Sequence, residues 1–144
     1  MADVIQRILE TLQTEPAFLC ALATLTEDGR PSVRTMRATI GDDLTIRCPT
    51  FLGTEKVAQI QACPEVHLTC GSRDSDRPGS YFRVEGRGEI STAAEDRTLA
   101  WNDRLAKWFA AGPDDPNYAV VRILPYRIVA FPIGGGPAAQ VWEP

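Results

Sequence analysis

The sequence predicts a mainly β (α+β) fold, an antiparallel barrel with a few flanking helices. Two observations carry this prediction. Stretches rich in strand-forming residues follow one another along most of the chain, and the connections between them are too short for repeated crossover helices. The length of 144 residues fits one compact domain. We expect this domain to span residues 1–133 and a Gly/Pro-rich tail to follow over 134–144.

The N-terminal part is predicted to contain one helix and three strands. Apolar residues at helical spacing predict the helix over residues 3–13, with Asp3 and Gln6 as a capping box. Pro16 prevents this helix from continuing. Strands are expected over 17–26, 32–40 and 43–48, joined by the turn sequences Asp28-Gly29 and Gly41-Asp42-Asp43.

The middle of the chain is predicted to form a short helix between strands. The helix is expected over 54–63, because Pro64 cannot continue it. Alternating residues predict strands over 66–69 and 81–90, with a charged loop between them. Gly86 and Gly88 mark a bulge or a close approach within the second of these strands.

The C-terminal part is predicted to contain the clearest helix of the chain and two strands. Thr92 and Glu95 form a capping box, and Gly112-Pro113 ends the helix. Large apolar residues lie on one stripe of this helix: Trp101, Leu105, Trp108 and Phe109. Two strands are expected over 118–124 and 126–131, broken at Pro125, and the tail beyond them has little to hold it.

The composition excludes several classes of function. A net charge of −4 and a pI near 5.0 argue against a nucleic-acid surface. The longest apolar run, 18–25, is too short to cross a bilayer, and no export signal begins the chain, so we expect a cytoplasmic protein without membrane contact. The four cysteines form no metal or disulfide pattern and are expected to be buried free thiols: Cys20, Cys48, Cys63 and Cys70.

Basic and hydroxyl residues gather around one strand-to-helix corner. They are Arg34, Arg37, Thr50, Thr54 and Lys56. Free backbone N–H groups at a helix start, together with a lysine, suit an anion. The corner therefore predicts a site for a phosphate-ended cofactor.

Several segments, taken in their order along the chain, carry a resemblance: 18–24, 28–31, 33–37, 56–57, 63–68 and 108–116. Their order resembles the FMN-binding split-barrel family that includes pyridoxamine 5'-phosphate oxidase, and in particular its shorter general stress protein branch. The resemblance covers the chain from the first helix to Phe131. It implies a six-stranded antiparallel split β-barrel of Greek-key type and a homodimer with FMN in a groove between the subunits.

The resemblance also implies which residues bind the flavin. The strand segment Arg34-Thr35-Met36-Arg37 is similar to the one beside the isoalloxazine ring, and Thr50, Thr54 and Lys56 match positions around the flavin phosphate. A regular strand places Arg34 and Arg37 on opposite faces. Either the strand contains a bulge, or one arginine serves elsewhere or is a solvated strand residue.

Four further residues near this corner have alternative interpretations. Cys48 and Pro49 contact the ring or ribityl chain by position, or else a cysteine at a strand end simply packs. Trp108 belongs to the core or a subunit interface, or contacts the flavin across a dimer. Glu55 stands where the longer oxidases carry arginine, and its carboxylate is tolerable beside a phosphate only if it points outward.

The predicted function is FMN binding with flavin-dependent oxidoreductase activity on a small molecule. The C-terminal stretch 131–144 contains no Arg, Lys or His, so oxidation of a vitamin B6 phosphate is not expected. His67 is interpreted as a structural strand residue, and no metal is expected. A non-catalytic flavin-buffering protein and a cofactor-free barrel dimer remain alternatives, and FAD or a deazaflavin in place of FMN is open.

Overall fold

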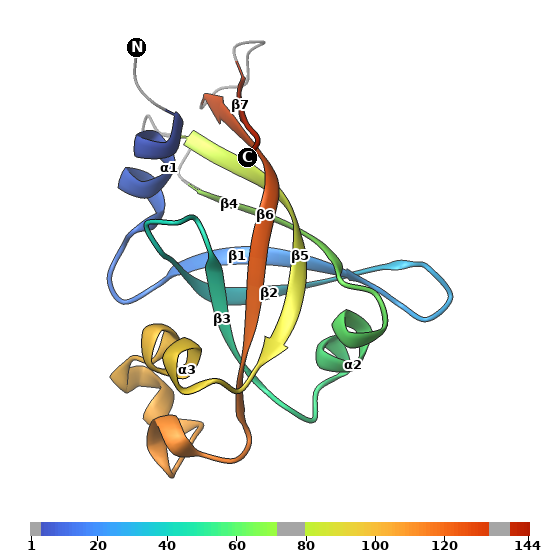
Figure 1. Ribbon diagram of the computed structural model, residues 1–144, viewed down its shortest axis with the longest axis vertical. Coiled ribbons are helices and arrows are strands. Elements are labelled where there is room, and N and C mark those ends of the chain that lie inside the picture. The colour runs from blue at the N-terminus through green and yellow to red at the C-terminus, as the bar shows by residue number, and fades with distance from the viewer. Residues whose placement is uncertain (1–3, 72–79, 133–138) are drawn as a thin grey trace.

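A computed structural model describes residues 4–71, 80–132 and 139–144, in which seven strands form one antiparallel sheet that closes on itself (Figure 1). Six strands, β1 to β6, make the barrel, as the sequence predicts, and β7 is added to β6. The strands are β1 (Phe18–Leu25), β2 (Pro31–Ile40), β3 (Ile46–Phe51), β4 (Glu65–Gly71), β5 (Ser80–Ser91), β6 (Tyr118–Pro132) and β7 (Gln140–Trp142). The helices are α1 (Val4–Leu12), α2 (Glu55–Ala62) and α3 (Ala94–Ala100), followed by the 3-10 helices η1 (Asp103–Lys107) and η2 (Gly112–Asp114).

The barrel closes through the pairing of β3 with β6, which joins the two ends of the strand order β3-β2-β1-β4-β5-β6. Side chains that alternate toward the inside of the barrel form its core, and among the described residues Leu22, Phe82 and Ile128 are fully buried there. α1 packs against one end of this core, while α2 and α3 lie at the other end (Figure 1). The alternating pattern of the sequence therefore defines the core.

The barrel is split between β2 and β3. β2 pairs with β1 at eight positions but with β3 at only two, Thr39 with Arg47 and Ile40 with Ile46. Over the rest of β2, within the described residues, no strand bonds to the edge that faces away from β1. The backbone N–H and C=O groups that point toward this edge are therefore not used in pairing with β3.

The strand predicted to break at Pro125 is continuous. β6 runs as one strand through this residue, and the extra residue Tyr126 forms a bulge opposite β5 between Glu85 and Gly86. A Cβ on Gly86 would lie 2.9 Å from the carbonyl oxygen of Leu124. The expectation of a bulge or close approach at Gly86 is thus confirmed, and the bulge accommodates the proline without ending the strand.

The expectation of an unsupported C-terminal tail is wrong for residues 140–142. They form β7, which covers the edge of β6 beyond the end of β3. Arg7 Nη1 of α1 donates a hydrogen bond to Gln140 Oε1 at 2.8 Å, and Trp142 packs on the core. Residues 133–138 and Asp3 of the predicted capping box lie outside the described part, and the division into a domain and a tail stays a prediction.

The prediction of one long helix after Thr92 is wrong. α3 starts after Ala93, which makes no side-chain cap, and ends at Ala100. Asn102 then accepts a hydrogen bond from the backbone N–H of Arg104 and begins the separate 3-10 helix η1. Because the chain turns here, the apolar stripe divides: Phe109 is buried against Tyr118, whereas Trp108 is exposed.

α3 is fixed to the barrel by a buried ion pair. Arg47 Nε of β3 lies 2.8 Å from Asp96 Oδ1, with both side chains about nine-tenths buried. Asp96 Oδ2 also accepts a hydrogen bond from Ser91 Oγ at 2.6 Å, and these bonds and the nearby arginines lower the pKa of Asp96 against the opposing effect of its burial. The pair holds the α3–η1 segment beside β3.

One predicted strand is displaced in sequence. The strand expected over 43–48 is found at 46–51, because Leu44 adopts a left-handed backbone with φ of 69° and the turn extends to Thr45. The other predicted strands and the short helix agree with the structure to within two residues at each end, apart from the joining of the last two strands. Among the described residues, no helix has the length and apolar character needed to span a bilayer.

Candidate functional site

Arg34 is held at one end of the split by hydrogen bonds to neutral groups. Its Nη1 donates to the carbonyl oxygens of Leu22 and Ser32 and to Thr24 Oγ1, at 3.2, 3.1 and 2.8 Å. Its Nη2 donates to Ser32 Oγ at 3.1 Å and to Gln59 Oε1 of α2 at 3.2 Å. The guanidinium is thus oriented before any ligand arrives, but none of these acceptors neutralises its charge.

Lys56 lies at the start of α2, close enough to Arg34 for their charges to interact. Partial burial, followed by the charge of Arg34, lowers the pKa of Lys56. Lys56 Nζ donates to Thr54 Oγ1 at 3.2 Å, and this hydroxyl lies 3.5 Å from Thr50 Oγ1. The structure therefore brings together four of the residues predicted around a phosphate: Arg34, Thr50, Thr54 and Lys56.

Glu55 is exposed, as a tolerable carboxylate next to a phosphate requires, but it is not remote from the cluster. Its Oε1 accepts a hydrogen bond from Gln59 Nε2 at 3.2 Å. Burial lowers the pKa of Arg34, and the Glu55 charge acts in the opposite direction. Glu55 thus offsets part of the positive charge of the site.

Cys48 faces the interior of the barrel and not the split. Its side chain is fully buried, and a hydrogen bond to Cys20, followed by burial, raises its pKa well above the ordinary value of a thiol. Burial likewise raises the pKa of Cys70. The interpretation of Cys48 as a plain packing residue fits this position, and a side-chain contact with a ligand in the split does not.

The remaining predicted residues lie along β2 or beside its edge that faces β3. Met36 is half-buried against the core, and Thr35 is exposed on the opposite face of the strand. Arg37, Pro49 and Trp108 line a groove between β2, β3 and η1, whose lining includes none of Arg34, Thr50, Thr54 and Lys56. β2 pairs with β1 without a shift in register from 31 to 38, so the two arginines do lie on opposite faces of a regular strand.

Sequence reasoning missed four residues at these two places. Thr24 and Gln59, joined by a 2.5 Å hydrogen bond, hold Arg34. Gln59 is one helical turn from Glu55 and Lys56, a spacing that indicates a shared face. Arg104 and Lys107 line the groove. No sequence signal pointed to Arg104 and Lys107, because the long helix predicted over residues 92–112 does not form.

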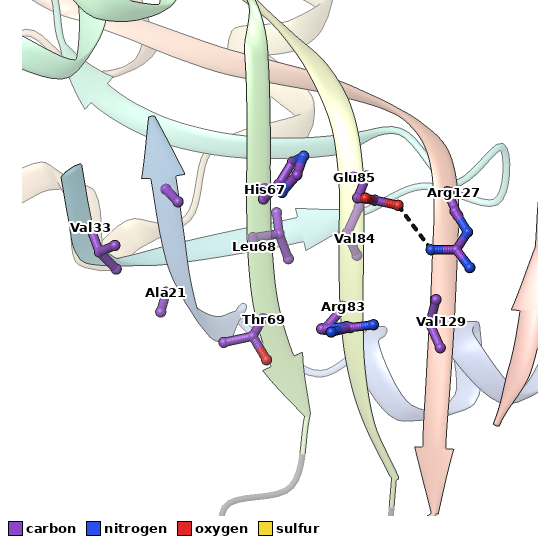
Figure 2. A pocket seen from close by; sticks show the side chains of 11 residues that line it. Ala21, Val33, His67, Leu68, Thr69, Arg83, Val84, Glu85, Arg127 and Val129 are labelled. Carbon is purple, nitrogen blue, oxygen red and sulfur yellow. Dashed lines mark hydrogen bonds and ion pairs between the residues drawn. The ribbon is translucent and has the colours of Figure 1, made fainter. Parts of the chain in front are cut away.

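A second, distinct surface lies on the outside of the sheet, where side chains of β1, β2, β4, β5 and β6 surround a hollow of about 340 Å³ (Figure 2). Val33 is 65% exposed at one side of it. Arg127 Nη1 lies 3.4 Å from Glu85 Oε2 at the other side, and His67 Nε2 lies 2.9 Å from Glu65 Oε2. We call this surface the outer face. His67 is exposed and paired with a carboxylate, as expected of a structural strand residue.

The barrel and its split define the class of the protein. The chain belongs to the pyridoxamine 5'-phosphate oxidase family, whose model matches residues 5–130. It is 33% identical over 126 residues to general stress protein 26 of Bacillus subtilis (strain 168), covering 88% of this chain and 86% of that protein.

Solved structures have the same fold. The crystal structure of general stress protein 26 from Bacillus anthracis str. Sterne matches with a TM-score of 0.79 and 24% identity, covering 98% of each chain. A structure described as an F420 reductase matches with a TM-score of 0.61 and 25% identity, covering 83% of this chain and 94% of that one. These relatives support the split-barrel fold and a stress protein of the pyridoxamine 5'-phosphate oxidase type.

Proposed function

We propose that this protein binds FMN in the barrel split and uses it as a flavin-dependent oxidoreductase of the general stress type, in the cytoplasm. The observation that carries the proposal is the pair of cations, Arg34 and Lys56, beside the unpaired edge of β2. Each is partly buried, and neither forms an ion pair within the described residues. A dianionic phosphate would compensate both charges.

The donor set fits both ends of an FMN molecule. Lys56, Thr54 and the charge of Arg34 would hold the phosphate near the start of α2. The free N–H and C=O groups of residues 34–37 would bond to the polar edge of the ring. Bound flavin supplies electron-transfer chemistry, and the protein supplies position and electrostatics.

A second copy of the chain is proposed to cover the outer face. Val33 and Tyr81 expose apolar surface there, and Ala21, Ala23 and Val129 line the hollow between the charged residues. Exposed apolar surface with a polar rim is typical of an interface. Val33 belongs to β2, whose unpaired edge carries the proposed flavin site, so a copy seated on the outer face would border the flavin. We propose a homodimer with the flavin at its interface; analytical ultracentrifugation would show a single species of twice the chain mass.

Comparison of FMN with riboflavin tests the phosphate site directly. FMN added to the flavin-free protein should lose fluorescence on binding, and riboflavin, which lacks the phosphate, should bind at least about tenfold more weakly, since charge-assisted hydrogen bonds contribute about 1.5–3 kcal/mol each. Equal affinity for the two flavins, or binding of neither, would contradict the proposal.

Two alternatives differ in measurable ways. Stopped-flow mixing of the FMN-loaded protein with NADH or NADPH separates an oxidoreductase, in which the flavin is bleached at a useful rate, from a flavin-buffering protein, in which it is not. Parallel titration with a deazaflavin and with FAD tests the identity of the cofactor. The likeness to an F420 reductase favours including the deazaflavin.

A further inference from the structure

An open hollow of about 990 Å³ lies between the β1–β2 turn and α2. Its lining comes from residues 25–28 and Arg30 of the turn region and from one face of α2 and its end: Glu55, Ala58, Gln59, Ala62 and Cys63. Gln59 also accepts a hydrogen bond from Arg34 Nη2 at 3.2 Å. The hollow, which we call the turn hollow, therefore borders the cation cluster of the proposed phosphate site.

The charge of the turn hollow is opposite in sign to that of the cation cluster. Three carboxylates and one arginine line it. Arg30 Nε lies 2.9 Å from Asp28 Oδ2, so these two charges compensate each other. Within the described residues, Glu27 and Glu55 form no ion pair, and both are exposed. The turn hollow therefore carries two uncompensated negative charges.

Glu55 places one of these charges beside the cation cluster. It precedes Lys56 at the start of α2, and its Oε1 accepts a hydrogen bond from Gln59 Nε2 at 3.2 Å. Burial lowers the pKa of Arg34, and the charge of Glu55 opposes this shift, so the carboxylate lies within electrostatic reach of the guanidinium. An anion held by the two cations therefore has a carboxylate on the side of the turn hollow.

A terminal phosphate matches this arrangement better than a bridging one. Arg34 and Lys56 supply two positive charges, and a phosphate monoester such as that of FMN carries about 1.5–2 negative charges at pH 7. In FAD the same phosphate is part of a pyrophosphate diester and carries only one. The second phosphate and the adenosine must then continue beyond the cations. In the turn hollow this second anion meets Glu27 and Glu55, and like charges repel.

We propose that Glu27 and Glu55 make the split specific for a cofactor that ends in a phosphate monoester, because they repel flavins whose phosphate continues into a second anionic group. FMN is accepted and FAD is excluded for this reason. The identity of the cofactor rests on the proposed function, whereas the preference for a terminal phosphate rests on the charges around the start of α2.

Isothermal titration calorimetry of the flavin-free protein with FMN and with FAD tests the preference. The wild-type protein should bind FMN at least about tenfold more tightly than FAD. Equal affinity for the two flavins, a measurement that needs no variant, would overturn the inference and leave the proposed function standing.

Variants assign the preference to the two carboxylates. Glu27→Gln should tighten FAD binding about threefold and leave FMN binding unchanged, because only the longer ligand enters the turn hollow. The double variant Glu27→Gln/Glu55→Gln should narrow the ratio of FMN to FAD affinity about tenfold. Glu10→Gln on α1, a carboxylate outside the lining of the hollow, is the control and should leave the ratio unchanged. An unchanged ratio in the double variant would overturn the inference, because exclusion by size does not depend on these charges.

Two probes without a flavin ring separate this inference from the proposed function. Ribose 5-phosphate ends in a monoester, and ADP-ribose carries the same ribose on a pyrophosphate. In two-dimensional NMR of the flavin-free protein, ribose 5-phosphate should shift the backbone N–H signals of Thr54 and Lys56 at concentrations at least about tenfold lower than ADP-ribose. If it does so while FMN fails to bind, the proposed function fails and the preference for a terminal phosphate stands. An equal response to the two probes, or a response to neither, overturns the inference.

Discussion

The two clusters of cations beside β2 differ in how they are held. Arg34 makes five hydrogen bonds with Leu22, Thr24, Ser32 and Gln59, so its position is fixed by the fold. The cations of the groove, Arg37, Arg104 and Lys107, are exposed, and their side chains form no hydrogen bond within the described residues. Lys107 contacts the ring of Trp108. A preorganised charge suits a resident cofactor, because the ordering cost is met by folding. Exposed charges without such bonds are not preorganised in this way.

Replacement of Arg34 should have the largest effect on flavin binding. Arg34→Ala removes the oriented charge, and loss of charge-assisted contacts at about 1.5–3 kcal/mol each predicts FMN binding that is weaker by about 100-fold or more. Riboflavin binding should change much less. Fluorescence titration of both flavins measures the ratio.

The control for this change is Arg37→Ala, on the opposite face of the same strand. It should leave the ratio of FMN to riboflavin affinity unchanged. The hydrogen bond between Thr24 and Gln59 does not involve Arg34. We therefore expect Arg34→Ala to fold, with a thermal midpoint of unfolding close to that of the wild-type protein. Loss of phosphate dependence in Arg37→Ala instead would invert the assignment of the two arginines.

Replacement of Lys56 should have a smaller effect, with a characteristic pH dependence. Burial and Arg34 lower the pKa of Lys56 in the free protein, and a bound phosphate would raise it. Binding is therefore strongest at pH values below the free-protein pKa, takes up a proton between the two pKa values, and is lost as the pH rises through the pKa of the complex.

Lys56→Ala should weaken FMN binding on the order of tenfold to 100-fold and remove this alkaline loss. Lys56→Arg, which stays charged, should keep the affinity and extend it to higher pH. Titrations across an alkaline pH series measure both variants. An alkaline loss that persists in Lys56→Arg would assign the titration to another group.

Removal of the Glu55 charge should have the smallest effect and the opposite sign. Glu55→Gln keeps a side chain able to bond with Gln59 but removes the charge that offsets Arg34. FMN binding should tighten about twofold to fivefold, and the gain should shrink at high salt, because exposed charges contribute about 0.2–1 kcal/mol. Glu10→Gln, on α1, is the matched control and should change nothing. Weaker binding in Glu55→Gln would indicate that Glu55 positions the cluster through Gln59.

Comparison of the two clusters also shows what made each predictable. The gathering of Arg34, Thr54 and Lys56 at one corner was predicted because the strand, turn and helix signals around them are local in sequence. The groove itself was not predicted: Arg37, Pro49 and Trp108, which line it, were named only as candidate contacts of the flavin. Their separation from Lys56 depends on how the segment after Ala100 folds back on the barrel, and the Arg47–Asp96 ion pair that fixes it joins residues far apart in sequence.

By itself, the sequence determined the antiparallel barrel and its hairpins, because alternation and turn chemistry act between near neighbours. That Arg34 and Arg37 lie on opposite faces was decided by the structure, in which β2 pairs with β1 without a bulge. Only the tertiary structure decided where β2 and β3 separate, that Thr24 and Gln59 hold Arg34, that Pro125 sits in a bulge of one continuous strand, and that residues 140–142 form β7. Each of these depends on pairing between distant segments, which local periodicity does not encode.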